Sequence, residues 1–327
     1  MRLVILNEKA MDKELAVPIY TQSGMIYLNK GAKINERNIE QIKKIGINTI
    51  YIDDGINDVT LQEIYDAPLR LKAIKELKNV FDECKRKKYV PEQPVIKIVE
   101  EIIENINISE NAYLYNNLAK NDKDLELCTH SLNVALLSII IGYKKKYSQD
   151  KILKLGIGAI LHDIGKIVSD GDDHTIEGYK LVKNNNYFSA TLCTCIRSHH
   201  ENEDGSGYPE KLKGDKIYEF AKIVSICNEY INILESDDSI LPHHAIEVLA
   251  AMGQQRFSND IYKDFVGSIY CYPNGLTVKL SNGLEAMVIK QNINMPTRPI
   301  VAFKENDNIK YIDLVNNLTI FIEEVVY

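Results

Sequence analysis

The histidines of this chain are gathered in one region, and this constrains the fold more than any other feature. Five of the seven lie within 71 residues, where apolar side chains recur at helical spacing. They are His130, His162, His174, His199 and His200. A buried polar group without a partner costs about 1–3 kcal/mol, so one helical core can hold this many imidazoles only if they share partners. We therefore predict several helices that converge on a metal centre.

Helical spacing places further polar side chains on the same inward faces. Glu126 and His130 are four residues apart, hence on one face of a helix. His199 continues an apolar stripe in ATLCTCIRSHH, and Asn228 stands in EFAKIVSICNEYINIL at a position where the pattern favours an aliphatic residue. Asp163 ends the apolar run LGIGAILHD, and a buried aspartate needs a partner or a cation. These residues are candidate ligands beside the histidines.

The donor types indicate which metals and which chemistry to expect. Imidazoles and carboxylates without nearby cysteine favour iron, manganese or zinc over a structural thiolate zinc site. The seven or eight candidate ligands exceed what one ion binds, so we expect two or three divalent ions and a bridging hydroxide that attacks phosphorus. Phosphate ester hydrolysis demands roughly 20 kcal/mol of barrier lowering, whereas general acid–base catalysis supplies about 3–5 kcal/mol. Lys166, four residues after His162, is placed to neutralise a phosphoryl oxygen.

The segment HHENEDGSGYP predicts a loop that faces the substrate. Gly205 and Gly207 allow a tight turn whose backbone approaches a ligand closely. Tyr208 offers a flat aromatic face and a hydroxyl, and Pro209 stiffens the exit from the loop. Asp204 is expected to hold the loop shut through its carboxylate. Because this turn chemistry directly follows paired histidines, it indicates a substrate-binding role for these five residues.

Changes of pattern divide the 327 residues into four parts and predict a mainly α fold. Residues 1–60 mix short β-rich runs with one charged helical segment, which indicates a small α/β module. Residues 61–118 form a charged helical connector, and residues 119–265 an all-helical bundle that carries the clustered histidines. Residues 266–327 alternate apolar and polar side chains between Asn-Gly turn pairs, which is typical of a small β-rich module.

The charge balance limits the partners. Lys and Arg number 39 against 46 Asp and Glu, and the net charge of −7 repels duplex nucleic acid and anionic membranes. The N-terminus lacks the apolar centre of a secretory signal. The longest apolar run is about half the ~20 residues that a bilayer span needs. The six scattered cysteines fit a reducing compartment. We therefore expect a cytoplasmic protein. The charged helices of 61–118 offer a surface for a homodimer, and the flanking modules offer one for a signalling protein partner.

The motif LHDIGK together with HHENEDGSGYP resembles the HD-GYP group of the HD phosphohydrolase superfamily, over about residues 119–265. The resemblance implies an HD-GYP-type helical bundle and a metal-dependent phosphodiesterase that opens cyclic di-GMP to linear pGpG and, in some members, onward to GMP. It implies that the metal ligands are His130, His162, Asp163, His174, His199 and His200. Asp163 would bridge two ions, and Glu126 would serve a third. Lys166 would contact the scissile phosphate, and the Gly-Tyr-Pro loop would shape the substrate site.

The chain departs from that family at three places. Asn228 stands where the family has Asp, so its amide oxygen can bind a metal but brings no charge. Only seven residues separate Lys166 from His174, fewer than in the lid-bearing stretch of the family. The usual arginine-rich segment is replaced by ESDDSILP, whose Asp237 and Asp238 repel a dinucleotide phosphate.

These departures leave two alternatives to cyclic di-GMP hydrolysis. The first is a receptor with this fold that binds the dinucleotide without effective turnover and signals to a protein partner. The second is a metal phosphohydrolase that acts on another nucleotide. A cyclic dinucleotide or a related nucleotide is the expected small-molecule partner in each case.

Overall fold

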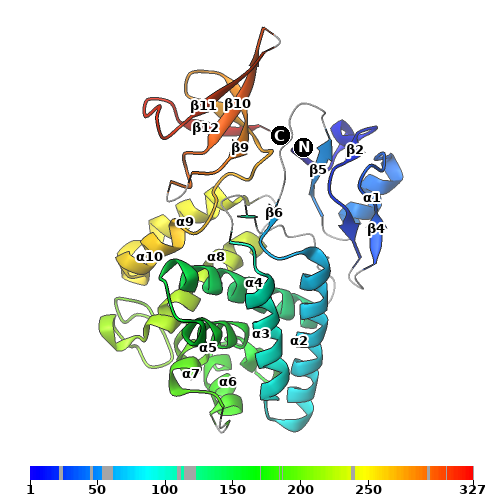
Figure 1. The fold of residues 1–327 in the computed structure, drawn as a ribbon. Helices are drawn as coiled ribbons and strands as arrows, with labels where there is room; N and C mark the ends of the chain where they lie inside the picture. Colours follow the sequence, from blue (N-terminus) through cyan, green and yellow to red (C-terminus); the bar gives the residue numbers. More distant parts are fainter. Residues whose placement is uncertain are drawn as a thin grey trace.

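A helical body with two small β-containing modules at one end makes up the computed structural model of the chain (Figure 1). The structure describes residues 1–21, 25–44, 47–53, 62–108, 112–113, 123–169, 171–183, 185, 187–236, 240–292, 295–306 and 308–326. Within these ranges helices dominate, so the predicted mainly α fold is confirmed.

The helical body runs from α2 to α10. Its helices are α2 (Ala67–Lys87), α3 (Glu92–Asn105), α4 (Lys123–Lys144), α5 (Gln149–Ile160), α6 (His174–Val182), α7 (Ala190–Ser198), α8 (Glu219–Ser236), α9 (Pro242–Arg256) and α10 (Asn259–Val266). Two short 3-10 segments, η2 (Ile164–Ile167) and η3 (Gly214–Lys216), connect them. Serine side chains cap two of the helices: the Ser148 hydroxyl accepts the N–H of Lys151 at the start of α5, and Ser189 accepts that of Leu192 in α7.

The central helix is α4, which is buried on most of its faces from Cys128 to Gly142. It packs against α5, α8 and α2. An 18-residue window of α4 has a mean hydropathy of 1.6, enough for a membrane span by length and composition, but 72% of that window is buried inside the protein. The helix thus has the burial of a core helix, and it presents side chains to the interior on several sides.

The two helices α2 and α3 share the core of the bundle. Leu77 and Phe81 of α2, and Val99 and Ile102 of α3, are buried in one continuous apolar cluster with α4 and α5. The segment predicted as a connector therefore packs as part of the helical body. Because residues 60, 61, 118 and 119 lie outside the described residues, the proposed division at those positions stays a prediction.

The N-terminal module is small and has its own apolar core. It contains β1 (Arg2–Ile5), η1 (Glu8–Ala10), β2 (Glu14–Leu15), β3 (Ile19–Tyr20), β4 (Ile26–Leu28), α1 (Glu36–Lys44) and β5 (Thr49–Asp53). Strand β5 lies between β1 and β2 in an antiparallel sheet, and β3 pairs with β4. Ile39 and Ile42 of α1 are buried against this sheet. Beyond it, β6 (Gln62–Glu63) pairs in parallel with β7 (Ala112–Tyr113).

The C-terminal module is β-rich, as predicted, and its strands form an antiparallel sheet. Its strands are β8 (Thr277–Leu280), β9 (Glu285–Lys290), β10 (Ile300–Glu305), β11 (Asn308–Asp313) and β12 (Ile322–Val326). They follow the order β11-β10-β9-β8-β12, with antiparallel pairing throughout. The turn between β8 and β9 contains Gly283 with φ of 83°, a left-handed conformation that favours glycine.

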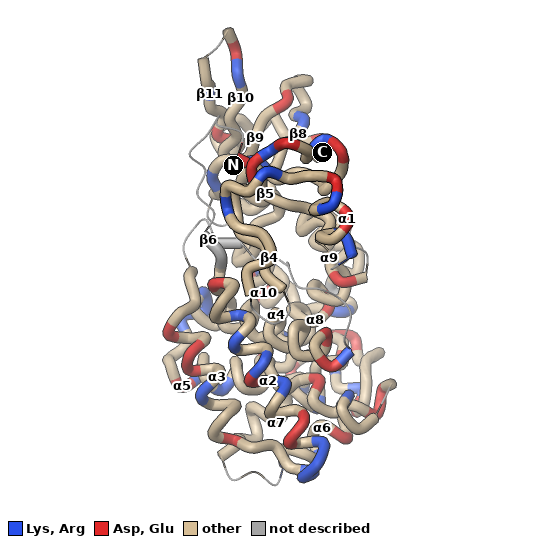
Figure 2. The backbone as a smooth tube through the Cα atoms, turned by 90° about the vertical axis from the view of Figure 1, so that its right-hand side faces the viewer, with Lys and Arg blue, Asp and Glu red and all other residues tan. Residues whose placement is uncertain are grey.

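The two modules contact each other. The backbone N–H of Leu3 donates to the carbonyl of Gly275 at 2.9 Å, and the Arg2 guanidinium donates to the Thr277 hydroxyl at 2.9 Å. Both signs of charge are interspersed over the modules and the outer helices (Figure 2).

Candidate metal centre

Residues from five helical segments meet at one buried centre, where α4, α5, α7 and α8 pack together and α6 packs on α7 (Figure 1). Two groups of side chains offer ligand atoms within 4.8 Å of one another. The first group is Asp163, His174, His199 and His200, and the second is His130, His162 and Asp163. The five clustered histidines and the aspartate of the sequence analysis thus lie together, and Asp163 belongs to both groups.

The turn after α5 delivers His162 and Asp163 to this centre. Helix α5 ends at Ile160, and η2 begins immediately after Asp163. Gly165 in η2 lies so close to α6 that a Cβ atom there would be 1.8 Å from the carbonyl oxygen of His174. A glycine at this position lets the turn and the start of α6 approach each other, which brings the His174 ring beside Asp163.

The Asp163 carboxylate is fully buried and faces four imidazoles. Its Oδ2 lies 3.2 Å from Nε2 of His162 and 3.5 Å from Nε2 of His130. Its Oδ1 lies 3.2 Å from Nε2 of His174 and 3.5 Å from Nε2 of His199. Burial alone would raise the pKa of this carboxyl, but the neighbouring imidazoles, first among them His162, hold that pKa well below its usual range. Asp163 is therefore ionised, with one oxygen toward each group.

Three of the imidazoles are oriented by backbone carbonyls. Nδ1 of His162, His174 and His199 lies 2.8, 2.6 and 3.0 Å from carbonyl oxygens three or four residues earlier in the chain. A carbonyl only accepts, so each Nδ1 carries the proton and each Nε2 presents a lone pair to the centre. Burial lowers the pKa of His162, and it lowers that of His199 to about 4. Neutral rings with an inward Nε2 are the form that binds metal.

His130 has a different environment, made by α8. Its Nδ1 lies 2.8 Å from Oε2 of Glu235, and its Nε2 lies 2.9 Å from Oδ1 of Asn228. Burial opposes protonation of this ring, but the hydrogen bond and charge of Glu235, with the charge of Asp163, raise its pKa overall. The sequence analysis identified Asn228 and missed Glu235. The available signal was the spacing of seven residues, which puts both side chains on one face of α8.

His200 connects the centre to the glycine-rich loop. Its ring lies 4.2 Å from that of His199 and 5.1 Å from that of His174, and the Tyr208 ring stacks on it at 4.7 Å with an angle of 16°. Burial, followed by the neighbouring His199 and His174, lowers the pKa of His200. Tyr208 and Pro209 are half-buried, so one edge of the loop is accessible beside the centre.

Close backbone contacts hold this loop in place. A Cβ atom at Gly207 would lie 2.3 Å from the carbonyl oxygen of His200, and Gly205 has φ of 84°. Asp204 is exposed, and its Oδ1 accepts the N–H of Ser206 at 2.8 Å, within the loop itself. The buried carboxylate of Glu201, which the sequence analysis did not single out, accepts two N–H groups from the residues after Pro209, at 2.7 and 2.8 Å.

Lys166 and Glu126 lie outside the two ligand groups. The Lys166 ammonium is 2.6 Å from Oδ2 of Asp163, and its side chain is 40% exposed, so a cation stands at the rim of the centre. Glu126 on α4 is exposed and belongs to neither group. Its role as a ligand of a third ion stays a prediction. Asp237 and Asp238 lie outside the described residues.

The residues present fit divalent metal ions. Nε2 of His162 and Oδ1 of Asp163 are buried and have no hydrogen-bond partner among the described residues. Atoms of this kind are costly inside a protein unless they bind something. Imidazole nitrogens and carboxylate oxygens are the donors that suit iron, manganese and zinc. His130, His162, His174, His199, His200 and Asp163 would hold the ions.

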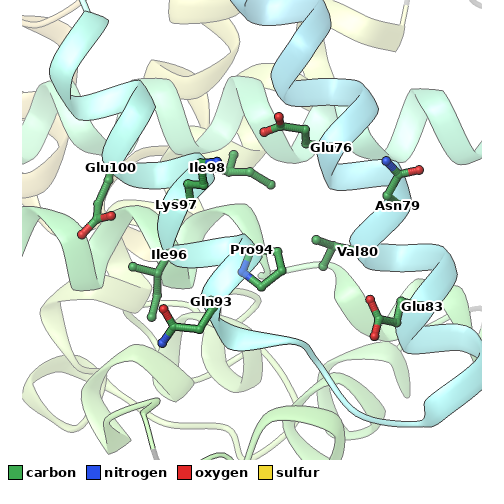
Figure 3. Close-up of a pocket in the computed structure, with 10 residues that line it drawn as sticks. All are labelled: Glu76, Asn79, Val80, Glu83, Gln93, Pro94, Ile96, Lys97, Ile98 and Glu100. Atoms are coloured by element: carbon green, nitrogen blue, oxygen red, sulfur yellow. The ribbon is translucent and has the colours of Figure 1, made fainter.

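A separate pocket of about 630 Å³ lies on the outside of the bundle, between α2 and α3 (Figure 3). Its lining residues are Glu76, Asn79, Val80, Glu83, Gln93, Pro94, Ile96, Lys97, Ile98 and Glu100. None of these residues belongs to the metal centre, so the pocket does not form part of it.

Known proteins resemble the part of the chain that carries this centre. Residues 127–233 match the family model of the HD domain. The cyclic di-GMP phosphodiesterase PA4108 of Pseudomonas aeruginosa is 25% identical over 182 residues, which are 50% of this chain and 44% of that protein. The cyclic di-GMP phosphodiesterase PdeB of Borreliella burgdorferi is 23% identical over 194 residues, 53% of this chain and 51% of that protein. A cyclic di-GMP phosphodiesterase of Thermotoga maritima is 25% identical over 203 residues, 55% of each chain.

The matches thus span about half the length of these relatives. Among solved structures, Bd1817, described as an HDG"Y"P protein of Bdellovibrio bacteriovorus, is similar with a TM-score of 0.47 and 18% identity, over 80% of this chain and 97% of that one. The predicted resemblance to HD-type phosphodiesterases is confirmed by the family model and by the curated relatives.

Proposed function

We propose that this chain is a metal-dependent phosphodiesterase that hydrolyses cyclic di-GMP to linear pGpG. The observation that carries the proposal is the shared carboxylate of Asp163, which faces imidazoles of both ligand groups through separate oxygens. Such a carboxylate suits two divalent ions held side by side. The three curated relatives, which are cyclic di-GMP phosphodiesterases, support the same substrate class.

The protein would divide the work between the ions and its own side chains. Bound divalent ions supply Lewis acidity toward the phosphoryl group and lower the pKa of water. His162, His174 and His199, fixed by their Nδ1 hydrogen bonds, keep the ligand geometry rigid before substrate arrives. Iron or manganese is the proposed metal, with zinc as the third choice. A cytoplasmic location is part of the same proposal.

Two side chains at the rim would contact the dinucleotide. The Lys166 ammonium stands beside Asp163 and is accessible, so it can approach a non-bridging phosphoryl oxygen. The Tyr208 ring is fixed by stacking on His200 and offers its other face to a guanine base. Asp204, Gly205, Gly207 and Pro209 would shape the same side of the substrate site.

The test is an assay of the purified full chain with cyclic di-GMP and added Mn²⁺ or Fe²⁺, followed by chromatography of the products. We expect pGpG from the wild type and none from His162→Ala, because that substitution removes a buried ligand. His244→Ala is the matched control, since this histidine is exposed and belongs to neither ligand group. Wild-type product levels in His162→Ala would overturn the proposal. A further time course shows whether GMP follows pGpG.

A second candidate function is a receptor that binds cyclic di-GMP without turnover and signals to a protein partner. Asn228 favours it, because an amide near the centre lowers the negative charge available to hold a metal. Binding of the dinucleotide by the metal-loaded wild type, without product, would support the receptor. Neither binding nor product would point to a phosphohydrolase of another nucleotide.

A further inference from the structure

We propose that Glu235 is a positioning residue of the metal centre: it fixes the His130 imidazole through Nδ1 and supplies the negative charge that Asn228 does not bring. The inference rests on the metal centre of the proposed function, and it concerns one side of that centre. It predicts that the ligand group of His130, His162 and Asp163 depends on a carboxylate outside the group itself.

The hydrogen bonds of the rings set His130 apart. Backbone carbonyls accept from Nδ1 of His162, His174 and His199. His130 has the Glu235 carboxylate at that position instead, with 2.8 Å between Nδ1 and Oε2. A carboxylate oxygen accepts, so Nδ1 keeps its proton, and Nε2, which donates to Oδ1 of Asn228 here, is the atom left to bind a metal. A carboxylate behind a histidine also makes that histidine a stronger donor to a metal.

The same helix face places the amide and the carboxylate on opposite sides of the ring. Asn228 and Glu235 are two turns apart on α8, and they lie against Nε2 and Nδ1 of His130. The amide of Asn232 donates to Oδ1 of Asn228 at 3.3 Å, which fixes that oxygen toward the ring. The Nε2 atom, the Asn228 oxygen and Oδ2 of Asp163 therefore converge, whereas Glu235 stands behind the ring.

The charges of the centre explain why this carboxylate matters. In the described part of the chain, the ion pairs of the clustered imidazoles run to two carboxylates, Asp163 and Glu235. Two divalent ions beside a single carboxylate would leave a large uncompensated positive charge in a buried site. The Glu235 side chain is 26% exposed and lies 2.8 Å from Nδ1 of His130, so it adds a second carboxylate beside the centre.

The experiment measures Mn²⁺ binding to the metal-free full chain by calorimetric titration, without any nucleotide. We expect Glu235→Ala to weaken one class of site by 10- to 100-fold and to leave the other class unchanged. Glu235→Gln should lose less Mn²⁺ affinity than Glu235→Ala, because its amide oxygen still accepts the hydrogen bond from Nδ1. Adding Asn228→Asp to Glu235→Ala should restore the affinity, because it returns a negative charge to the other side of His130.

Two controls separate positioning from folding. Glu219→Gln removes a carboxylate from the same helix that pairs with Lys145 at 3.0 Å and belongs to neither ligand group, so it should leave Mn²⁺ binding unchanged. Thermal unfolding of each metal-free variant shows whether it is folded. Wild-type affinity in Glu235→Ala, or a loss of affinity that Asn228→Asp does not restore, would overturn the inference.

The same data keep this inference apart from the proposed function. A wild type that binds Mn²⁺ with the expected dependence on Glu235 but releases no pGpG would refute the hydrolysis and leave the role of Glu235 standing. If the wild type hydrolyses cyclic di-GMP but Glu235→Ala binds Mn²⁺ as tightly as the wild type, the role of Glu235 is refuted and the hydrolysis stands. Absence of Mn²⁺ binding in the wild type would overturn both.

Discussion

The substitution Gly165→Ala tests whether the close approach of η2 and α6 builds the metal centre. A Cβ atom at this position would lie 1.8 Å from the His174 carbonyl oxygen and 2.7 Å from the backbone nitrogen of Gly178. Both neighbours are backbone atoms, so neither can rotate away. Real Cβ atoms essentially never come within 3.0 Å of such atoms, so the two segments must separate by about 1.2 Å, from 1.8 to 3.0 Å.

We expect this separation to lower the stability of the fold only moderately and to disturb the metal centre strongly. Overpacking of this kind costs about 1–3 kcal/mol, which a domain with roughly 5–15 kcal/mol of stability survives. The displacement falls on His174, the first residue of α6, whose Nε2 lies 3.2 Å from Asp163. A misplacement of about 1 Å in a catalytic group lowers activity on the order of 100-fold. We therefore expect a folded protein with weakened metal binding and about 100-fold less hydrolysis.

Three measurements check this expectation: the metal content per chain, the hydrolysis rate and the midpoint of thermal unfolding. Gly142→Ala in α4 is the matched control, because a Cβ there meets only side-chain atoms at 3.4 Å or more, an ordinary contact distance. Alanine also favours a helix over glycine by up to about 1 kcal/mol. Full metal content and activity in Gly165→Ala would refute the reasoning, since the site would then tolerate a shift of α6.

Three further predictions follow from the geometry of the centre. Lys166→Gln should lower hydrolysis about 100-fold with unchanged metal content, because the ammonium stands at the rim beside Asp163; equal rates for variant and wild type would count against this role. Glu201→Gln leaves one buried N–H of the following loop unpaired, so denaturant unfolding should show a loss of about 1–3 kcal/mol, and an unchanged midpoint would contradict it. Burial lowers the pKa of His199 from 6.5 to about 4. Between these two pH values the unfolded chain binds a proton at this imidazole, whereas the folded protein does not. His199 alone should therefore lower the free energy of unfolding of the metal-free protein by about 3 kcal/mol between pH 6.5 and pH 4, and a flat profile would exclude this account.

The sequence predicted the convergence of the histidines because local spacing determines which way a helical side chain points. His199 continued an apolar stripe, and it lies buried in the centre. Asn228 stood at an inward position, and it contacts His130. In these cases the inward face of one helix is enough to place the residue. The β-rich C-terminal module was predicted on similar grounds, from alternation and glycine turns.

Features that depend on how helices pair could not be predicted in this way. The contact of Glu235 with His130 joins residues 105 apart, and it exists only because α8 packs on α4. The burial of Glu201 depends on the path of the loop after Pro209. The charge of residues 61–118 predicted a helical connector, but α2 and α3 each carry an apolar stripe that packs into the bundle. Charge density describes the outer face of a helix and says little about the inner one.

The bond between Leu3 and Gly275 has a practical consequence for anyone who shortens this chain. Leu3 and Tyr51 of the first module pack in the same apolar cluster as Leu276 and Val288 of the last one. Removal of either terminal module would expose apolar side chains of the other module to water. A shortened version for crystallography or binding work should therefore keep both ends.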